Sequence, residues 1–213
     1  GLIEEVNSTY ATWNWQNVLN FTRTFNSVHN LTATAVQEYT HSETEYMDGS
    51  VYELSDPFFS EHIISNTFGQ KDVGGWKSEN GLASYMFRAN YNYDSKYYIG
   101  ASIRYDGLSK LPKDTRWGTF WGASAAWRLS REKFWTEAPV NEWFNDLRLR
   151  ASYATIGNSA LGSDYPYLGT YGAKLVGPMA GIAWNVMGNN NLKWETTETF
   201  DIGLDGALFN NRM

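Results

Sequence analysis

Carboxylate pairs are the residues of this 213-residue chain whose spacing first suggests chemistry. The pairs are Glu4 with Glu5, Glu43 with Glu45, and Glu195 with Glu198. Glycoside hydrolysis uses two carboxyl groups that lie about 5 to 9.5 Å apart on either side of a sugar. Proximity in the sequence does not establish that separation, and most of these carboxylates fall where we expect loops or strand ends. We therefore expect no catalytic residue and no enzymatic activity.

Metal and nucleophile chemistry have as little support in the composition. The chain has no cysteine, which excludes a disulfide scaffold, a thiolate metal site and a cysteine nucleophile. Its three histidines, His29, His41 and His62, are scattered, and the acidic residues show no EF-hand spacing. The net charge of −6 argues against a nucleic-acid partner. We expect no metal and no cofactor.

Aromatic side chains in the expected loops are the better candidates for contact with a substrate. They are Trp76, Tyr165, Tyr167, Tyr171 and Trp184. A flat ring offers an apolar face to a sugar or a partner protein and loses little entropy on binding. The alternative, in which these rings pack the loops against one another or lie near lipid headgroups, stays open.

β-Strands must position these groups, because alternation with a period of two recurs along the chain and helical periodicity is scarce. The clearest case is 97–106, where Tyr97, Ile99 and Ile103 alternate with Ser102 and Arg104. The same split of apolar and polar faces occurs in four further segments, at 84–93, 121–129, 147–153 and 199–208, and less regularly in two earlier ones, at 13–25 and 31–40. We predict an all-β chain of about seven antiparallel strands.

The connections alternate in length. Those near 26–30 and 94–95 are short, whereas those at about 44–80, 107–116 and 157–193 are longer and rich in Gly, Asn, Asp and Pro. The connection at 130–145 lies on the short side, and we expect in it one turn of helix capped by Ser130. Short turns at one end and long outer loops at the other are typical of an outer-membrane β-barrel.

A soluble β-sandwich that binds carbohydrate would also alternate and is one alternative; a small structural outer-membrane barrel is another. Two features favour a membrane barrel: aromatic residues end the apolar faces, and the polar faces carry charges in mid-strand. Seven strands do not close alone, because single-chain bacterial barrels have an even number. Unpaired strand edges are not tolerated within lipid. We therefore predict a transmembrane β-barrel wall segment, one partial domain over residues 1–213 of a larger barrel.

Several blocks of residues resemble one family of outer-membrane proteins. The blocks are RANYNYDSKYY (88–98), RYDG (104–107), WGTF (117–120), AAWRLS (125–130) with EKF (132–134), LRLRASY (147–153) with GN (157–158), and NLKWETTETFDIGLD (191–205). In this order and approximate spacing, they resemble the SusC/RagA-type TonB-dependent outer-membrane transporters. The resemblance is good from about residue 81 to 213 and thin before that.

The resemblance implies a 22-stranded barrel with a plug domain in its lumen, in the outer membrane of a Gram-negative bacterium. The inner-membrane TonB complex would supply energy through the plug, and no plug domain is recognisable in this chain. Such transporters work with a SusD-like surface lipoprotein to import oligosaccharides, peptides or another bulky nutrient. The lipid of the outer membrane would contact the apolar faces of the strands.

Charged side chains on the polar faces would then point into the lumen. They are Arg88, Arg104, Arg128, Arg148, Arg150, Asp201 and Asp205. The arginines could bind the plug or steer a polar substrate along the lumen. They could instead form lateral ion pairs with neighbours such as Asp106, Asp201 and Asp205. Both interpretations are compatible with the sequence.

Overall fold

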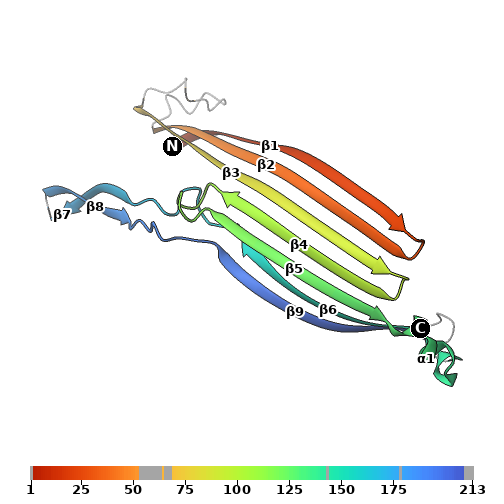
Figure 1. Cartoon of the computed structure of the whole chain (residues 1–213). Helices are drawn as coiled ribbons and strands as arrows, with labels where there is room; N and C mark the ends of the chain where they lie inside the picture. The colour runs from red at the N-terminus through yellow and green to blue at the C-terminus, as the bar shows by residue number, and fades with distance from the viewer. Residues whose placement is uncertain (1, 53–63, 65–68, 143, 178, 209–213) are drawn as a thin grey trace. The chain divides into compact units, whose positions relative to one another are not determined.

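The computed structural model describes residues 2–52, 64, 69–142, 144–177 and 179–208. Nearly all of them are antiparallel β-structure (Figure 1). The strands are β1 (Leu2–Phe25), β2 (His29–Tyr52), β3 (Lys71–Tyr93), β4 (Tyr97–Leu108), β5 (Trp117–Arg128), β6 (Phe144–Asn158), β7 (Thr170–Val176), β8 (Met179–Val186) and β9 (Glu195–Leu208). One seven-stranded sheet has the order β1-β2-β3-β4-β5-β6-β9, and β7 and β8 form a separate hairpin. The predicted fold class is confirmed.

The chain divides into two compact units. The first consists of Gly1–Asn14 and Thr40–Gly81, and the second of Trp15–Tyr39 and Leu82–Met213. In the first unit, Asn14 Nδ2 donates a hydrogen bond of 2.7 Å to Thr40 Oγ1. Ile3 and Val51 are its buried apolar side chains among the residues described. Each unit thus has its own cross-strand contacts.

In the second unit, strand register makes the two predicted faces continuous. Ala101 of β4 lies opposite Ala89 of β3 and Ala123 of β5. The next residue along β4, Ser102, lies opposite Arg88 and Gly122. Directly paired residues project to the same side of a sheet. The apolar residues of neighbouring strands therefore share one face, and the polar residues share the other.

Aromatic rings stack across the strands at both ends of the apolar face. At one end, Tyr97 stacks with Tyr93 and Trp127, with ring centroids 6.3 and 6.4 Å apart. At the other end, Tyr105 stacks on Trp117 at 4.7 Å. These contacts create two rows of rings, separated along β4 by the residues 98–104.

Two tight turns, Phe25–Val28 and Tyr93–Lys96, connect β1 to β2 and β3 to β4. Their central residues, Asn26-Ser27 and Asp94-Ser95, all have positive φ, between 48° and 59°. Positive φ at both central positions is characteristic of the type I′ turn, whose twist matches that of the flanking strands. The amide of Lys96 closes the second turn on the carbonyl of Tyr93 at 2.9 Å. The second of these turns therefore connects two strands in register.

The structure changes the boundaries of the long connections. The predicted loop at 44–80 is wrong at both ends, because β2 continues to Tyr52 and β3 begins at Lys71. Between them, 53–63 and 65–68 lie outside the described residues. The interval between β4 and β5 is 109–116, within the loop that we predict at 107–116. The segment predicted as a loop at 157–193 contains the β7–β8 hairpin, which the sequence analysis did not identify.

The connection between β5 and β6 contains a 3-10 turn, Leu129–Arg131, and a four-residue helix α1, Lys133–Thr136. The predicted cap is wrong: Glu132 occupies the N-cap position of α1, without a side-chain cap. The hydroxyl of Ser130 instead donates a hydrogen bond to Asp146 at the start of β6. Among the described residues, no helix has the length and hydrophobicity needed to cross a membrane.

Candidate functional site

The polar face of the second unit brings together several of the charged residues predicted to face a lumen. Arg148 of β6 is directly opposite Asp205 of β9 and binds it, with Nη2 2.9 Å from Oδ2. Arg150 Nε lies 3.4 Å from the other oxygen of the same carboxylate. Asp205 thus holds two arginines on one side of the sheet. Both are lateral ion pairs, and Asp205 is a partner that the sequence suggested.

Arg104 and Arg128 are paired within the same face. Arg104 Nε lies 2.7 Å from Asp106, whose side chain is almost buried, and its Nη2 reaches Ser84 at 3.1 Å. Arg128 forms a two-point contact with Asp146, Nε to Oδ1 at 2.7 Å and Nη2 to Oδ2 at 2.6 Å. Two parallel hydrogen bonds of this kind fix the direction of a guanidinium group. The sequence analysis did not identify Asp146 as a partner.

Arg88 and Asp201 differ from the other charges on this face, because neither forms an ion pair with another described residue. Asp201, Arg148 and Arg150 line an open cavity of about 500 Å³ that extends across several strands. Asn90 and Ser124 contribute further polar groups to it. The cavity therefore presents positively charged, negatively charged and neutral polar groups to a molecule or protein domain bound there.

Loop 109–116 and the end of the segment before β9 are joined by side chains. Trp194 Nε1 donates a hydrogen bond of 2.8 Å to the carbonyl of Arg116. Thr115 Oγ1 donates to the carbonyl of Leu192. Lys110 forms an ion pair of 3.0 Å with Asp164. These three contacts, which we call the loop junction, hold loop 109–116 against Asp164, which precedes β7, and against 192–194, which precedes β9.

Buried apolar side chains support the loop junction. Leu111 is 1% exposed and Leu108 is 3% exposed. Phe120 of β5 is 6% exposed and meets Trp194 edge to face, with centroids 5.2 Å apart. Phe120 and Trp194 were not among the predicted site residues, although WGTF and NLKWE are two of the motifs noted in the sequence. The loop junction is therefore supported by three buried apolar side chains, those of Leu108, Leu111 and Phe120.

The five predicted substrate-contacting aromatics are divided between the two units, Trp76 in the first and the other four in the second. Trp76 lies in β3 of the first unit and not in a loop, and it stacks on Tyr46 at 5.6 Å. Tyr171 and Trp184 are cross-strand partners in the β7–β8 hairpin, with centroids 4.0 Å apart. Tyr165 and Tyr167 precede that hairpin, and their backbone carbonyls accept hydrogen bonds from Leu168 and Asn189. Three of the five rings therefore pack on other rings of their own unit.

Comparison with known proteins identifies the family. The family model described as "TonB dependent receptor-like, beta-barrel" matches residues 4–213. This chain belongs to that family. TonB-dependent receptor P39 of Formosa agariphila is 32% identical over 211 residues, which are 99% of this chain and 20% of the relative. SusC of Bacteroides thetaiotaomicron is 32% identical over 150 residues, 67% of this chain and 15% of SusC.

Solved structures agree with this assignment. The structure of the RagAB peptide transporter superposes with a TM-score of 0.80 at 26% identity, covering 98% of this chain and 23% of that chain. The "open-open" state of the RagAB peptide importer superposes with a TM-score of 0.78 at 27% identity. The resemblance to the SusC/RagA type is thus confirmed. Two curated relatives match nearly the whole of this chain, and the chain spans about a fifth of their length.

Proposed function

We propose that this chain is part of the barrel wall of a TonB-dependent transporter that imports a bulky nutrient across a Gram-negative outer membrane. The observation that carries the proposal is a single sheet with one apolar and one polar face. On the apolar face, Ile99, Ile103 and Ile202 are each at least 50% exposed. So large an exposed apolar surface is typical of contact with lipid or with another protein.

The two rows of aromatic rings fit the thickness of a membrane. Tyr97 and Tyr105 are eight positions apart in β4, about 27 Å along the strand at roughly 3.4 Å per residue. A strand tilted by about 40° would place the two rows about 20 Å apart along the membrane normal, near the ~25 Å apolar band of such barrels. A soluble sandwich would instead cover this face with a second sheet of comparable size, and among the described residues the second sheet has only the two short strands β7 and β8.

On the polar face, Arg88, Asp201 and the paired arginines would line the lumen, where a plug domain would lie. The loop junction and the β7–β8 hairpin would belong to the outer surface, where a SusD-like lipoprotein would help to capture the substrate. The related RagAB structure is described as a peptide transporter. We infer that the substrate is a peptide or an oligosaccharide and that uptake depends on the TonB complex.

A matched pair of substitutions tests the membrane orientation. Ala123 and Ser124 are consecutive exposed residues of β5 on the apolar and polar faces respectively. An arginine near the middle of the lipid-facing band costs about 2–4 kcal/mol, whereas lumen positions tolerate charge. In the full-length protein, Ala123→Arg should sharply reduce the amount folded in the outer-membrane fraction, and Ser124→Arg should reduce it little. Equal amounts of the two variants would contradict the orientation.

Uptake itself is tested by deleting the gene for the full-length protein. The deletion strain is grown on peptide mixtures and, separately, on defined oligosaccharides as the sole carbon source. It should lose growth on at least one of these two classes. The wild-type gene should restore growth, and removal of TonB should abolish it. Unchanged growth on both substrate classes would refute the proposed import function. Loss on only one class identifies the substrate.

A further inference from the structure

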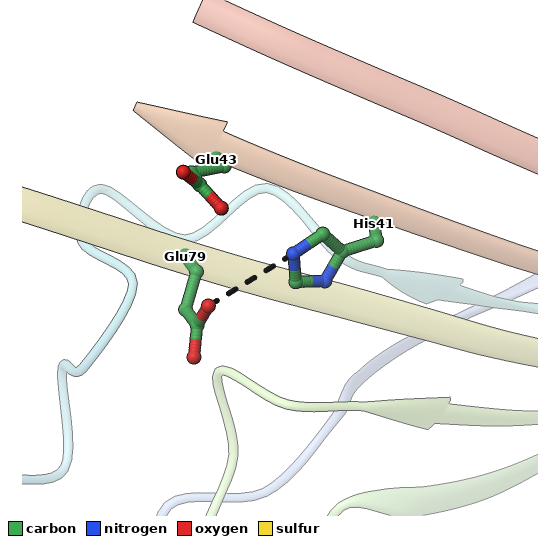
Figure 2. A group of neighbouring side chains, drawn as sticks. All are labelled: His41, Glu43 and Glu79. Carbon is green, nitrogen blue, oxygen red and sulfur yellow. Dashed lines mark ion pairs between the residues drawn. The ribbon is translucent and has the colours of Figure 1, made fainter. Parts of the chain in front are cut away.

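Three potential metal ligands converge on one face of the first unit (Figure 2). His41 and Glu43 are two positions apart in β2, so their side chains project to the same side of the strand. Glu79 comes from β3. One ligand atom from each residue lies within 4.8 Å of the other two, and His41 Nε2 is 3.9 Å from Glu79 Oε2. The sequence did not suggest this group, because Glu79 is far from His41 along the chain.

The donor set suits a first-row divalent cation. Zinc binds imidazole nitrogen at about 2.0–2.1 Å and carboxylate oxygen at about 2.0–2.2 Å, which places tetrahedral ligands about 3.4 Å apart. The distance of 3.9 Å between His41 Nε2 and Glu79 Oε2 exceeds that value by about 0.5 Å, and the other pairs of ligand atoms, all within 4.8 Å, exceed it by at most about 1.4 Å. The side chain of Glu79 is 56% exposed and can rotate to close the gap. Three protein ligands would leave one coordination position for water or another group.

The balance of charge around the three ligands favours a cation. The group contains three carboxylates, those of Glu43, Glu45 and Glu79, and one ammonium, that of Lys77. Lys77 Nζ binds Oε1 of Glu43 at 2.5 Å and Oε1 of Glu45 at 3.1 Å. The carboxylates outnumber the ammonium, so the group carries excess negative charge. The second oxygen of Glu43 and the carboxylate of Glu79 remain for coordination.

The imidazole of His41 is held in place before any ion binds. Its ring packs on Trp13 of β1 with centroids 5.7 Å apart, and its side chain is only 24% exposed. A ligand whose orientation is already restricted loses less entropy when it coordinates. His41 is therefore the most ordered of the three ligands, and Glu79 is the most adaptable.

We propose that His41, Glu43 and Glu79 form a binding site for a divalent transition-metal cation of the zinc type. The site crosslinks β2 and β3 in the first unit. It does not depend on the proposed transport function, because its three ligands and their charges are all contained in this unit.

Isothermal titration of the metal-free full-length protein in detergent with zinc chloride at pH 7 tests the site. His41→Ala and Glu79→Gln should each abolish the binding of one zinc equivalent or lower its affinity at least about tenfold. Mutation of a residue that only supports a metal ligand already costs about 10- to 100-fold in affinity. Glu45→Gln is the matched control. Like Glu79→Gln, it removes one negative charge, here from β2, which carries His41 and Glu43. Because Glu45 lies outside the three ligands, the variant should leave that equivalent within about threefold of wild type.

Two outcomes would overturn the proposal. One is a wild-type protein that has no zinc equivalent sensitive to His41→Ala. The other is a Glu45→Gln variant that loses as much affinity as Glu79→Gln, which indicates general attraction to an acidic surface. A hundredfold excess of magnesium should not displace the bound zinc, because imidazole favours transition metals over magnesium. Retained heat-resistant β-structure in each variant shows that its fold is intact.

Discussion

Replacing Gly157 by alanine should loosen the loop junction. A Cβ atom at this position of β6 would lie 2.1 Å from Phe120 Cζ and 2.6 Å from Phe120 Cε1. Carbon atoms pack at about 3.5–4.0 Å, so the ring of Phe120 must move by about 1.5 Å. Phe120 is 6% exposed and borders Trp194, so the movement displaces the indole that donates a hydrogen bond to Arg116.

The expected cost follows from overpacking a buried site, about 1–3 kcal/mol. Because every 1.4 kcal/mol corresponds to tenfold, local opening should become about 5- to 140-fold more frequent. Hydrogen exchange measured by mass spectrometry on the full-length protein in detergent reads this change directly. Peptides covering 108–116 and 189–194 should exchange faster in Gly157→Ala, since local opening exposes their amides.

Gly162→Ala is the matched control, because nothing lies within 4 Å of a Cβ at that position. It should leave exchange unchanged or slow it slightly. A second variant, Phe120→Leu combined with Gly157→Ala, should recover part of the lost protection, since the two positions share one contact. If Gly157→Ala exchanges like Gly162→Ala, the packing of Phe120 against β6 does not stabilise the junction, and the reasoning is refuted.

Three further predictions concern the turn end of the sheet. Ser95→Gly should stabilise the second unit by about 0.5–1 kcal/mol, because Ser95 has φ of 54° and glycine adopts positive φ without strain. Chemical denaturation of Ser95→Gly and of Ser109→Gly compares their free energies of unfolding. Asp146→Asn should destabilise the β5–β6 connection by about 1–2 kcal/mol, since it weakens the two-point contact with Arg128; denaturation midpoints of Asp146→Asn and Asp114→Asn should differ accordingly. Hydrogen bonds from Tyr97 and Trp127 lower the pKa of Glu132 below its usual value of 4.5. The stability that these hydrogen bonds contribute is therefore present above pH 4.5 and is lost as the pH falls through the lowered pKa. This loss should be absent in Glu132→Gln when unfolding is followed across pH 3–6.

Alternation predicted the seven strands of the sheet because each has one apolar face over at least part of its length. It did not predict β7 and β8, because Gly172 and Gly181 within them and Gly177 between them are typical loop residues. The hairpin nevertheless forms through cross-strand pairs such as Tyr171 with Trp184. Residue type indicated a loop there, whereas pairing between two segments decided the structure.

Ion-pair partners could be predicted only where register follows from neighbouring strands. Asp205 was among the suggested partners, and it lies directly opposite Arg148. Asp146 was not found in the same way, because it lies in β6 two positions before Arg148, the residue directly opposite Arg128, whereas the predicted strand began only at 147. The Ser130 hydroxyl also binds Asp146, and it does not cap α1.

The ends of β2 and β3 explain the largest error in predicting the strands. β2 has 24 residues, whereas a strand needs about 9–11 to cross a membrane. Its odd-numbered positions are apolar at Leu31, Ala33 and Ala35 and become charged at Glu43 and Glu45. Where both faces are polar, the period-two signal vanishes although the backbone continues as a strand, so 44–52 and 71–80 resembled loops. The loss of alternation therefore marks the end of the apolar surface and not the end of the sheet, and the proposed cation site is formed from the first charged positions beyond it.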